Sequence, residues 1–494
     1  INIAGRSVFF TNGSQLFTNS QGQGNAGNIA INALDTALFD GVSSSGEATI
    51  LAANLNSTAR GNGGKIAINA ESVFLSNGAE IIAHTEGQGN AGSITINAND
   101  IFLDGVGSNG ESSGLGSAAF GTARGNAGEI KIDTHSLTAT NSASLFVASF
   151  GQGDAGSVTI NAKGAVSFDG VGLNGRSSNA FSTLEQGSTG NGREINITAN
   201  SLSLTDGAAI GTATNARGNG GNIKINVNTL NVLNGGQILT TSRNGGNAGN
   251  ITVGATDSIT LSGSDPTYAE RLGLIGRPVV RNQGAASGLF ADTDAGSTGS
   301  GGNINVRARS LSISNGALLN ANSSGQGIAG DIEVDSRSIE LDNKAGISVT
   351  AASGNGGNIS LKARNLLTLR RGSQISTTAG IAGAGGDGGN ISIDNHHGFI
   401  IAAPNENSDI TANAFNGLGG SIRIDSASIF GMQQLTRSDL MSLLEADNSI
   451  RLDPQQLATN NITAFSQTSP DLSGTININT PEVELNPGLV NLPS

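Results

Sequence analysis

One tyrosine and three arginines in a single segment are the strongest candidate for binding chemistry in this sequence. Residues 262–288 contain Tyr268, the only tyrosine of the chain, together with Arg271, Arg277 and Arg281. The formal net charge of the chain is −13, so such a group of arginines is unusual for it. Arginine and tyrosine side chains often anchor protein interfaces. The segment is therefore a candidate partner-contact loop; the alternative is a loop packed on the protein body, with arginines that offset nearby acids.

Residues that could bind a metal ion occur in the chain, but they do not form convergent sets. His396 and His397 are adjacent, yet no further ligand accompanies them, and His84 and His135 occupy unrelated places in the sequence. The segment Gly385–Gly389 is similar to a calcium-binding nonapeptide, but that motif repeats and this segment occurs once. We expect no bound metal and no cofactor.

A catalytic surface on a repeat protein would need carboxylates, lysine and arginine together on one outer face, where they could bind calcium and abstract a proton. The outward positions of the repeated strand described below are mostly small and neutral, as at Ala30, Thr95, Thr159, Asn196 and Ser360. We therefore expect no enzyme. The alternative is a polysaccharide-degrading β-helix enzyme, such as a lyase.

A repeat of about 28 residues must position all of these side chains. The segment Gly27–Ala33, GNIAINA, occurs fourteen times with small changes, and Ile1 begins a clipped further copy. The first apolar residues of the fourteen copies are Ile29, Ile66, Ile94, Ile130, Val158, Ile195, Ile223, Ile251, Ile304, Ile332, Ile359, Ile391, Ile422 and Ile476. Repeats of this length are typical of solenoids, in which each unit contacts mainly its neighbours. The sequence predicts one elongated body of about 15 coils, and we expect the natural protein to extend upstream of Ile1.

One unit, residues 64–92, contains three short apolar alternations, and each is long enough for one strand. They are Ile66 with Ile68, Val73 with Leu75, and Ile81 with Ala83. Each strand can pair in parallel with its copy in the next unit, about 4.8 Å away, so that inward residues stack. The predicted fold class is therefore all-β, a single-stranded parallel β-helix.

The residues between the strands fit the corners of such a coil. An asparagine follows the first strand, as at Asn32, Asn69 and Asn97, and we expect it to bond to its own copy one coil away. Pairs such as Asn77–Gly78 supply the positive φ that the second corner needs. Glycine loops such as GQGNAG at 87–92 should stack closely, and a phosphate-binding loop is the alternative.

Three insertions interrupt alternate units after the second strand, at about 40–50, 104–117 and 169–182. They begin at aligned aspartates, Asp40, Asp104 and Asp169, which we interpret as turn formers rather than metal ligands. Long polar loops cost a solenoid little stability, so these flaps are either inert or part of a binding face.

Two further insertions differ from the flaps. Residues 262–288 carry the arginine cluster, and residues 431–465 have helical spacing of apolar residues, with Ser438 as a possible helix cap and Pro454 opening a second short turn. The body is predicted to span 1–480 as one parallel β-helix, with a short helical flap near its C-terminal end. Residues 481–494, which contain three of the eight prolines, should form an extended C-terminal tail.

Composition argues against several classes of protein. The chain has no cysteine, so disulfides and thiolate metal sites are impossible. Its net charge of −13 argues against nucleic acid as a partner, because that partner needs a basic surface. No stretch reaches the roughly 18 apolar residues of a membrane-spanning helix.

The repeated GNAGNIAINA and GNGGNIKIN blocks, over about 1–430, resemble the repeat region of cyanobacterial filamentous-haemagglutinin-like exoproteins. The segments 397–414, HGFIIAAPNENSDITANA, and 474–481, GTININTP, are similar to the closing part of that family. The family is the secreted partner of two-partner secretion systems. The resemblance implies a right-handed parallel β-helix shaft, export through an outer-membrane secretion pore, and an extracellular or outer cell-surface location. It implies adhesion or aggregation, and it supplies no catalytic residues.

Three functions follow as hypotheses. The first is an adhesin-type shaft whose surface loops contact extracellular polysaccharide or other cell surfaces. The second is the polysaccharide-degrading enzyme already named. The third is a self-assembling extracellular filament or sheath, in which open coil ends join head to tail.

Overall fold

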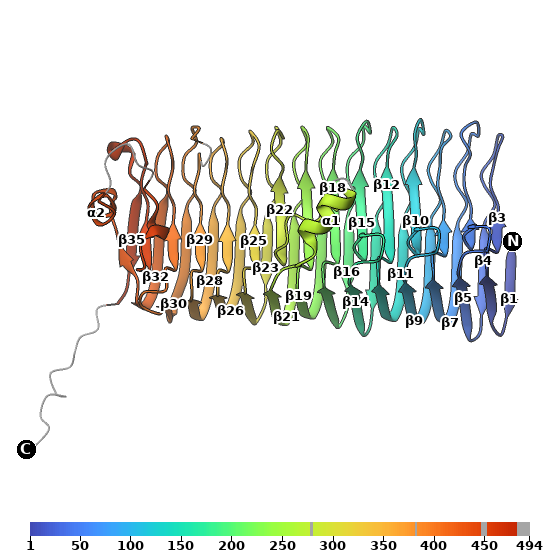
Figure 1. The fold of residues 1–494 in the computed structure, drawn as a ribbon, viewed down its shortest axis with the longest axis horizontal. Helices are drawn as coiled ribbons and strands as arrows, with labels where there is room; N and C mark the ends of the chain where they lie inside the picture. The colour runs from blue at the N-terminus through green and yellow to red at the C-terminus, as the bar shows by residue number, and fades with distance from the viewer. Residues whose placement is uncertain (277–279, 381–382, 446–451, 482–494) are drawn as a thin grey trace, which may run out of the picture.

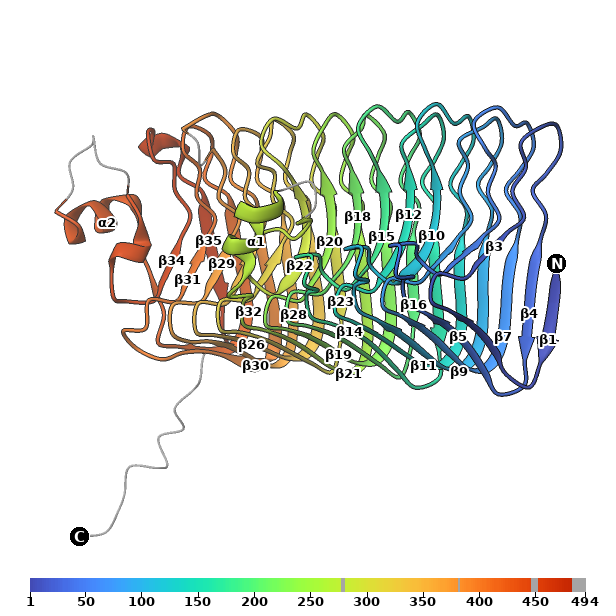
Figure 2. The ribbon, with the colours of Figure 1, turned by 45° about the vertical axis from the view of Figure 1, so that its right-hand side comes forward.

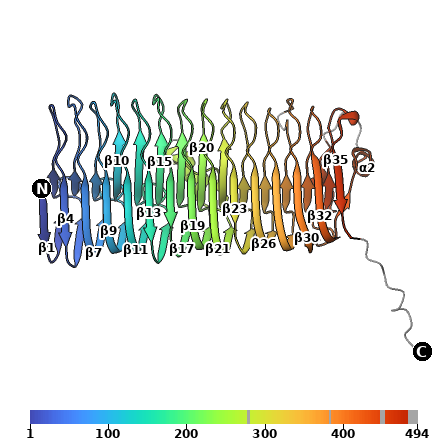
Figure 3. The same cartoon turned by 180° about the vertical axis from the view of Figure 1, so that it is seen from behind.

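The chain folds into one elongated stack of parallel β-strands (Figure 1). The computed structural model describes residues 1–276, 280–380, 383–445 and 452–481. Figure 3 shows the same order of coils from behind, with β1 at one end of the stack and β35 at the other. This confirms the predicted arrangement in its general form, a mostly-β, solenoid-like stack of parallel strands. The predicted extended tail at 481–494 lies outside the described residues, apart from Pro481.

The larger sheet contains 20 strands, which carry the first and second apolar alternations of each unit. Its strands are β1 (Asn2–Gly5), β2 (Val8–Thr11), β4 (Ile29–Ala33), β5 (Thr36–Asp40), β7 (Ile66–Ser76), β9 (Ile94–Asp104), β11 (Ile130–Thr140), β13 (Val158–Ala162), β14 (Ala165–Asp169), β16 (Ile195–Thr198), β17 (Ser201–Thr205), β19 (Ile223–Leu233), β21 (Ile251–Ser262), β23 (Ile304–Arg307), β24 (Ser310–Ser314), β26 (Ile332–Asp342), β28 (Ile359–Leu369), β30 (Ile391–Ala402), β32 (Ser421–Phe430) and β35 (Thr475–Asn479). Two of the three expected strands thus run together in many coils, as in β7, because their corner does not interrupt the extended backbone.

The smaller sheet contains 15 strands, and most of them carry the third alternation of a unit. Its strands are β3 (Gln15–Phe17), β6 (Ile50–Ala52), β8 (Glu80–Ile82), β10 (Gly114–Ala119), β12 (Ser144–Ser149), β15 (Asn179–Leu184), β18 (Ala209–Thr214), β20 (Gln237–Ser242), β22 (Gly288–Thr293), β25 (Leu318–Asn320), β27 (Gly346–Ser348), β29 (Gln374–Ser376), β31 (Asp409–Thr411), β33 (Gln433–Gln434) and β34 (Asn461–Thr463). The strand pairings within the two sheets are parallel throughout the described residues, as in-register stacking of coils requires.

The predicted register of the coils is confirmed. Ile29 pairs with Ile66, Ile66 with Ile94, and the same alignment continues to the pair of Ile422 with Ile476. The inward residues of both sheets form one continuous core in which most side chains are 0–1% exposed. Because a slip by one residue would turn this apolar set outward, the alternation itself fixes the register.

The corner residues behave largely as their types predict. Asn77 and Gly78 both have positive φ, 55° and 82°. Nδ2 of Asn69 donates to Oδ1 of Asn32 at 2.8 Å, so the predicted side-chain ladder exists there. The glycine loops stack so closely that a Cβ on Gly64 would lie 2.0 Å from the carbonyl O of Gly27. These contacts confirm the close stacking predicted for the loops.

A second asparagine ladder, not predicted from the sequence, runs through the glycine loops. Oδ1 of Asn62 accepts the backbone N–H of Asn90 at 2.9 Å, and Oδ1 of Asn90 accepts that of Asn126 at 2.9 Å. The pattern continues to Asn247, whose Oδ1 accepts the N–H of Ser300 at 2.9 Å. Each asparagine satisfies a backbone donor that the loop leaves free of strand pairing.

The three flaps are small antiparallel hairpins, closed by the bridges Val42–Ala48, Val106–Ser112 and Val171–Ser177. Their aspartates bond to the following coil. Oδ1 of Asp40 accepts from Oγ of Ser76 at 2.5 Å and from Nδ2 of Asn77 at 2.8 Å. Asp104 makes the same two contacts with Thr140 and Asn141, and Asp169 accepts from Oγ1 of Thr205. These carboxylates therefore join neighbouring coils.

The fourth insertion contains a helix that is not evident from the sequence pattern, α1 (Tyr268–Ile275). Figures 1 and 2 show α1 lying against the side of the stack near its middle. The insertion covers an apolar cluster on the outer face of the 15-stranded sheet. The cluster consists of Phe181, Ala209, Leu239 and Phe290, with Ala286 of the insertion packed against them.

The fifth insertion is partly helical, as predicted. It contains α2 (Arg437–Leu443) and a short 3-10 helix at Pro454–Gln456, and a further 3-10 helix follows at Pro470–Leu472. The expected cap, Ser438, is wrong: Thr436 caps α2 and forms a capping box with Asp439, because the helix begins at Arg437. No helix in the described part of the chain is long and apolar enough to cross a membrane.

Candidate functional site

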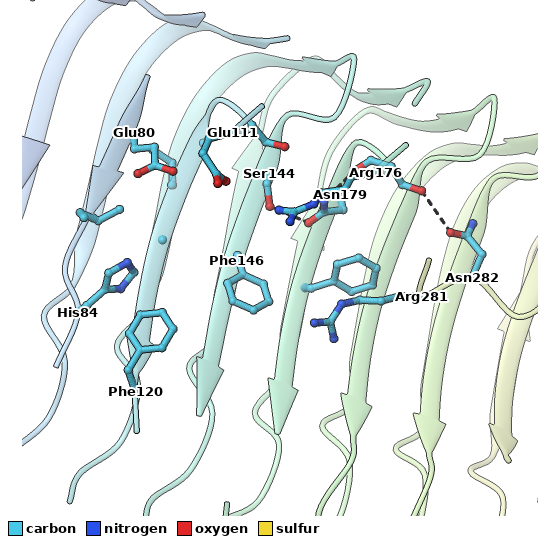
Figure 4. A pocket seen from close by; sticks show the side chains of 17 residues that line it. Glu80, His84, Glu111, Phe120, Ser144, Phe146, Arg176, Asn179, Arg281 and Asn282 are labelled. Atoms are coloured by element: carbon cyan, nitrogen blue, oxygen red, sulfur yellow. Dashed lines mark hydrogen bonds between the residues drawn. The ribbon is translucent and has the colours of Figure 1, made fainter. Parts of the chain in front are cut away.

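A groove of about 290 Å³ lies on the outer face of the 15-stranded sheet, across β8, β10, β12 and β15 (Figure 4). Two rows of outward side chains, held in register by strand pairing, form its floor. The first row consists of Glu80, Gly114, Ser144 and Asn179. The second row consists of Ile82, Gly116, Phe146 and Phe181. The floor is therefore polar along one row and mainly apolar along the other.

At β10 the apolar row has a glycine, Gly116, between Ile82 and Phe146. Gly114, in the polar row, serves close packing instead, because a Cβ there would lie 2.2 Å from the carbonyl O of Ser144. A Cβ built on Gly116 would meet Cε1 of His84 at 3.1 Å and Cγ2 of Ile82 at 3.5 Å. A side chain at this position would thus push against His84 as it extends into the groove.

The insertions form the walls of the groove. The second flap contributes Glu111 and Ser112, the third contributes Arg176 and Ser177, and the fourth insertion contributes Arg281 and Asn282. The first flap, at 40–50, contributes none of the residues that line the groove. Insertions from three places in the sequence therefore meet at one site.

Glu80 has the environment of a carboxyl group that holds its proton. Burial, and to a smaller extent the charge of Glu111, raise the pKa of Glu80 from its usual value near 4.5 to about 7. Glu111 is exposed on the flap. Figure 4 shows both carboxyl groups on the same side of the groove. Near pH 7 Glu80 is therefore protonated in only part of the molecules, and in these it can donate a hydrogen bond beside the second carboxyl group.

His84 is held as a neutral imidazole. Its Nδ1 accepts the backbone N–H of Ala118 at 3.0 Å, so the ring proton must lie on Nε2. Burial lowers the pKa of His84 to about 4. The ring also packs edge-on against Phe120, with centroids 4.9 Å apart, and Phe120 in turn stacks on Phe150 at 5.0 Å. His84 therefore contributes an aromatic wall rather than a charge.

Arg271 fits the alternative interpretation of residues 262–288, a loop packed on the protein body with arginines that offset nearby acids. This residue is 5% exposed, and its guanidinium pairs with the carboxylate of Asp265. Nη1 of Arg271 also donates to the carbonyl O of Gly175 at 3.3 Å and to Oγ of Ser177 at 3.4 Å. Arg271 holds the insertion on the third flap, because a buried guanidinium requires such partners.

Arg281 lies in the groove, although only a small part of its side chain is exposed. Its guanidinium carbon lies 5.7 Å from the ring centroid of Phe146 and 5.5 Å from that of Phe181. Nη2 of Arg281 donates to Oε1 of Glu185 at 2.8 Å. Burial alone would raise the pKa of Glu185, but the charge and hydrogen bond of Arg281 outweigh it and leave that pKa below its ordinary value. The Arg281 charge is thus already balanced.

Of the other two predicted contact residues, the structure describes only Tyr268. Tyr268 begins α1 and its hydroxyl lies 3.5 Å from the carbonyl O of Asn282, but it is not among the residues that line the groove. Arg277 lies outside the described residues. Whether the four residues contact a partner therefore stays a prediction.

Sequence reasoning missed most of the groove. Phe146 and Phe181 occupy the same place in consecutive units, so a table of outward residues of the third strand would have shown them. Glu80 and Glu111 have no such signal, because Glu80 lies in a strand and Glu111 in a flap of the next coil.

The metal candidates remain without a set of ligands. The rings of His396 and His397 contact each other, with centroids 4.8 Å apart. Across the residues that the structure describes, no group of three or more histidine, cysteine, aspartate or glutamate side chains could hold a metal ion.

Comparisons with protein-family models, curated proteins and solved structures found no match to this chain.

Proposed function

We propose that this chain is the structural shaft of a secreted or cell-surface adhesin of the two-partner secretion type. In this proposal the stack is a right-handed single-stranded parallel β-helix of about 15 coils that reaches the cell exterior through an outer-membrane pore. The groove on the 15-stranded sheet is its contact site for other cells or extracellular material. The groove is the observation that carries the proposal.

Two features support this reading of the groove. The regular coils satisfy their own hydrogen bonds and bury their apolar rows, so they offer little for a partner to bind. At β10 the regularity breaks, because Gly116 removes a side chain from the apolar row while the second and third flaps line the groove beside it. Binding sites on rigid scaffolds are often built from such loops.

The flaps provide a direct test of adhesion. The purified chain, coupled to beads, would be tested for attachment to whole bacterial cells and to extracellular matrix. Replacing residues 105–112 by the short Asn-Gly corner of the unit 64–92 removes Glu111 and one wall of the groove. The same replacement of residues 41–48 is the matched control, because the first flap does not line the groove.

Attachment should fall when residues 105–112 are replaced and persist when residues 41–48 are replaced. Equal attachment by both variants would remove the groove from the proposal. Absence of attachment by the unmodified chain to every surface tested would leave a passive spacer and contradict the adhesin function.

A second candidate function is hydrolysis of a polysaccharide. Glu80 and Glu111 face one groove, and the raised pKa of Glu80, about 7, is typical of a general acid paired with a second carboxyl group. Release of reducing ends from a panel of polysaccharides, abolished in Glu80→Gln, would support it. Absence of release from all of them would exclude hydrolysis of that panel.

A further inference from the structure

We infer that the groove binds an uncharged oligosaccharide that lies along the axis of the stack, from Glu80 toward Arg176. This inference rests on the proposed function, because it names the ligand of the same groove. It follows from the two rows of the floor, the hollow at β10 and the charges at the rim.

The two rows match the two kinds of surface on a sugar ring. A pyranose ring has faces made of C–H groups and an edge of hydroxyl groups. In the apolar row the half-buried ring of Phe146 offers a flat surface for such a face, whereas the neighbouring Phe181 is only 5% exposed under the insertion. The parallel polar row contains Ser144, whose Oγ donates to Oδ1 of Asn179 at 2.9 Å, and these groups can also bond to hydroxyls. Sites of this kind combine an apolar floor with a few placed polar groups.

The direction of the ligand follows from the direction of the rows. The rows run across β8, β10, β12 and β15, one residue from each strand. Three strand spacings give a length of about 14 Å, which accommodates a short extended chain of sugar rings. Flaps wall one side of the groove, and His84 and Phe120 line it as well. An extended ligand therefore fits along the stack better than a compact one.

The charges at the Glu80 end of the groove disfavour a ligand with carboxylate groups there, while the exposed Arg176 lies at the other end. The carboxylate of Glu111, and that of Glu80 when it is ionised, would repel an anionic sugar at one end, and the chain as a whole has a net charge of −13. Arg281 is already paired with Glu185, so it does not call for an anionic ligand. A protonated Glu80 can donate to a hydroxyl oxygen while Glu111 accepts from a hydroxyl. Uncharged hydroxyl groups satisfy both acids without introducing a like charge.

Two substitutions test the groove in opposite ways. Gly116→Leu places a side chain in the hollow, and its backbone does not lie in the left-handed region that favours glycine. Phe146→Ala removes part of the flat floor. Ser348→Leu is the matched control for the first, since Ser348 belongs to the same sheet outside the groove. Phe399→Ala, an exposed phenylalanine of the 20-stranded sheet, is the control for the second.

The probes are cellopentaose and maltopentaose as uncharged oligosaccharides, and pentagalacturonate as an anionic one, titrated into the full chain by calorimetry. At least one uncharged probe should bind, and pentagalacturonate should bind at least about tenfold more weakly. Gly116→Leu and Phe146→Ala should each weaken binding about tenfold, while both controls stay within about twofold of the unmodified chain. Thermal unfolding of each variant confirms that the shaft remains folded.

The inference is overturned if neither uncharged probe, nor any neutral glycan on a glycan array, binds while the unmodified chain still attaches to cells. It is also overturned if a glycan binds equally well to Gly116→Leu and Phe146→Ala. These results leave the adhesin function standing, because attachment is measured separately. Loss of attachment by the unmodified chain instead contradicts the proposed function.

Discussion

Replacing Arg271 by methionine tests whether a buried ion pair holds residues 262–288 on the shaft. Arg271 is 5% exposed, and its guanidinium pairs with Asp265. Methionine retains much of the apolar stem but removes the charge and its hydrogen bonds. The carboxylate of Asp265 then stays buried, with the N–H of Thr267 at 2.8 Å and the Oγ1 of Thr267 at 2.7 Å as its remaining donors.

The expected effect follows from the cost of an unpaired buried charge. Removal of one partner from a buried ion pair typically costs about 3–5 kcal/mol. We expect about 3 kcal/mol, because Thr267 still donates two hydrogen bonds to Asp265. Since about 1.4 kcal/mol corresponds to a factor of ten, local opening of the insertion should become about 100-fold more frequent.

Hydrogen exchange read by mass spectrometry measures this opening peptide by peptide. Peptides within 262–288 should exchange about 100-fold faster in Arg271→Met, while peptides of β7 and β9 remain unchanged, because distant coils contact only their neighbours. A dye that binds exposed apolar surface should bind more strongly, since the insertion covers Leu239 and Phe290.

The control is Arg6→Met, which removes an exposed ion pair with Asp35 at 3.2 Å. Exposed pairs contribute little, so its exchange pattern should match that of the unmodified chain. An acceleration of less than about threefold within 262–288 of Arg271→Met would refute the reasoning, because the ion pair would then not anchor the insertion.

Three further predictions concern the shaft and the groove. Gly64→Ala should reduce the free energy of unfolding by about 1–3 kcal/mol and so lower the melting temperature, because the new Cβ would lie 2.0 Å from the carbonyl O of Gly27 in the preceding loop. Gly22→Ala is the control and should leave the melting temperature unchanged, since a Cβ there meets nothing within 4 Å. Phe168→Ala should cost about 3–5 kcal/mol in thermal or denaturant unfolding, because the ring is 0% exposed in the continuous core; a change below about 1 kcal/mol would contradict the stacked core. The pKa of Glu80 is raised to about 7 in the folded chain. Between about pH 4.5 and pH 7 the folded chain therefore binds more protons at this group than the unfolded chain does. As a result, Glu80 makes the free energy of unfolding fall as pH rises through that window. The difference in melting temperature between about pH 5 and pH 8 should therefore shrink in Glu80→Gln, and an unchanged difference would show that Glu80 titrates normally.

The coils were predictable because their determinants are local. The alternation of apolar residues around Ile66 selects which face is buried, and a one-residue slip would expose that whole face. Asn77 and Gly78 fix a corner through their own backbone preferences. The same local logic located the flaps and the helical part of the fifth insertion, although it misplaced the start of α2 by choosing Ser438 over Thr436.

The contacts of Arg271 and Arg281 could not be predicted, because they depend on which earlier coils the long insertion packs against. Arg271 contacts Gly175 and Arg281 contacts Glu185, in each case 96 residues earlier in the chain. The sequence shows that these side chains are charged and rare on this chain. It does not show that carboxylates and carbonyl groups of earlier coils lie within reach.

By itself, the sequence determined the repeat, the buried rows and the corners, because each of these depends on residues close together in the chain or one period apart. Tertiary structure alone decided the groove. Glu80, Gly116, Phe146 and Arg281 become neighbours only after flaps of unequal length are looped out and strands β8 to β15 pair in register. Strand pairing brings side chains from successive coils to about 4.8 Å spacing whatever the length of the intervening loop, so the site reflects stacking rather than sequence spacing.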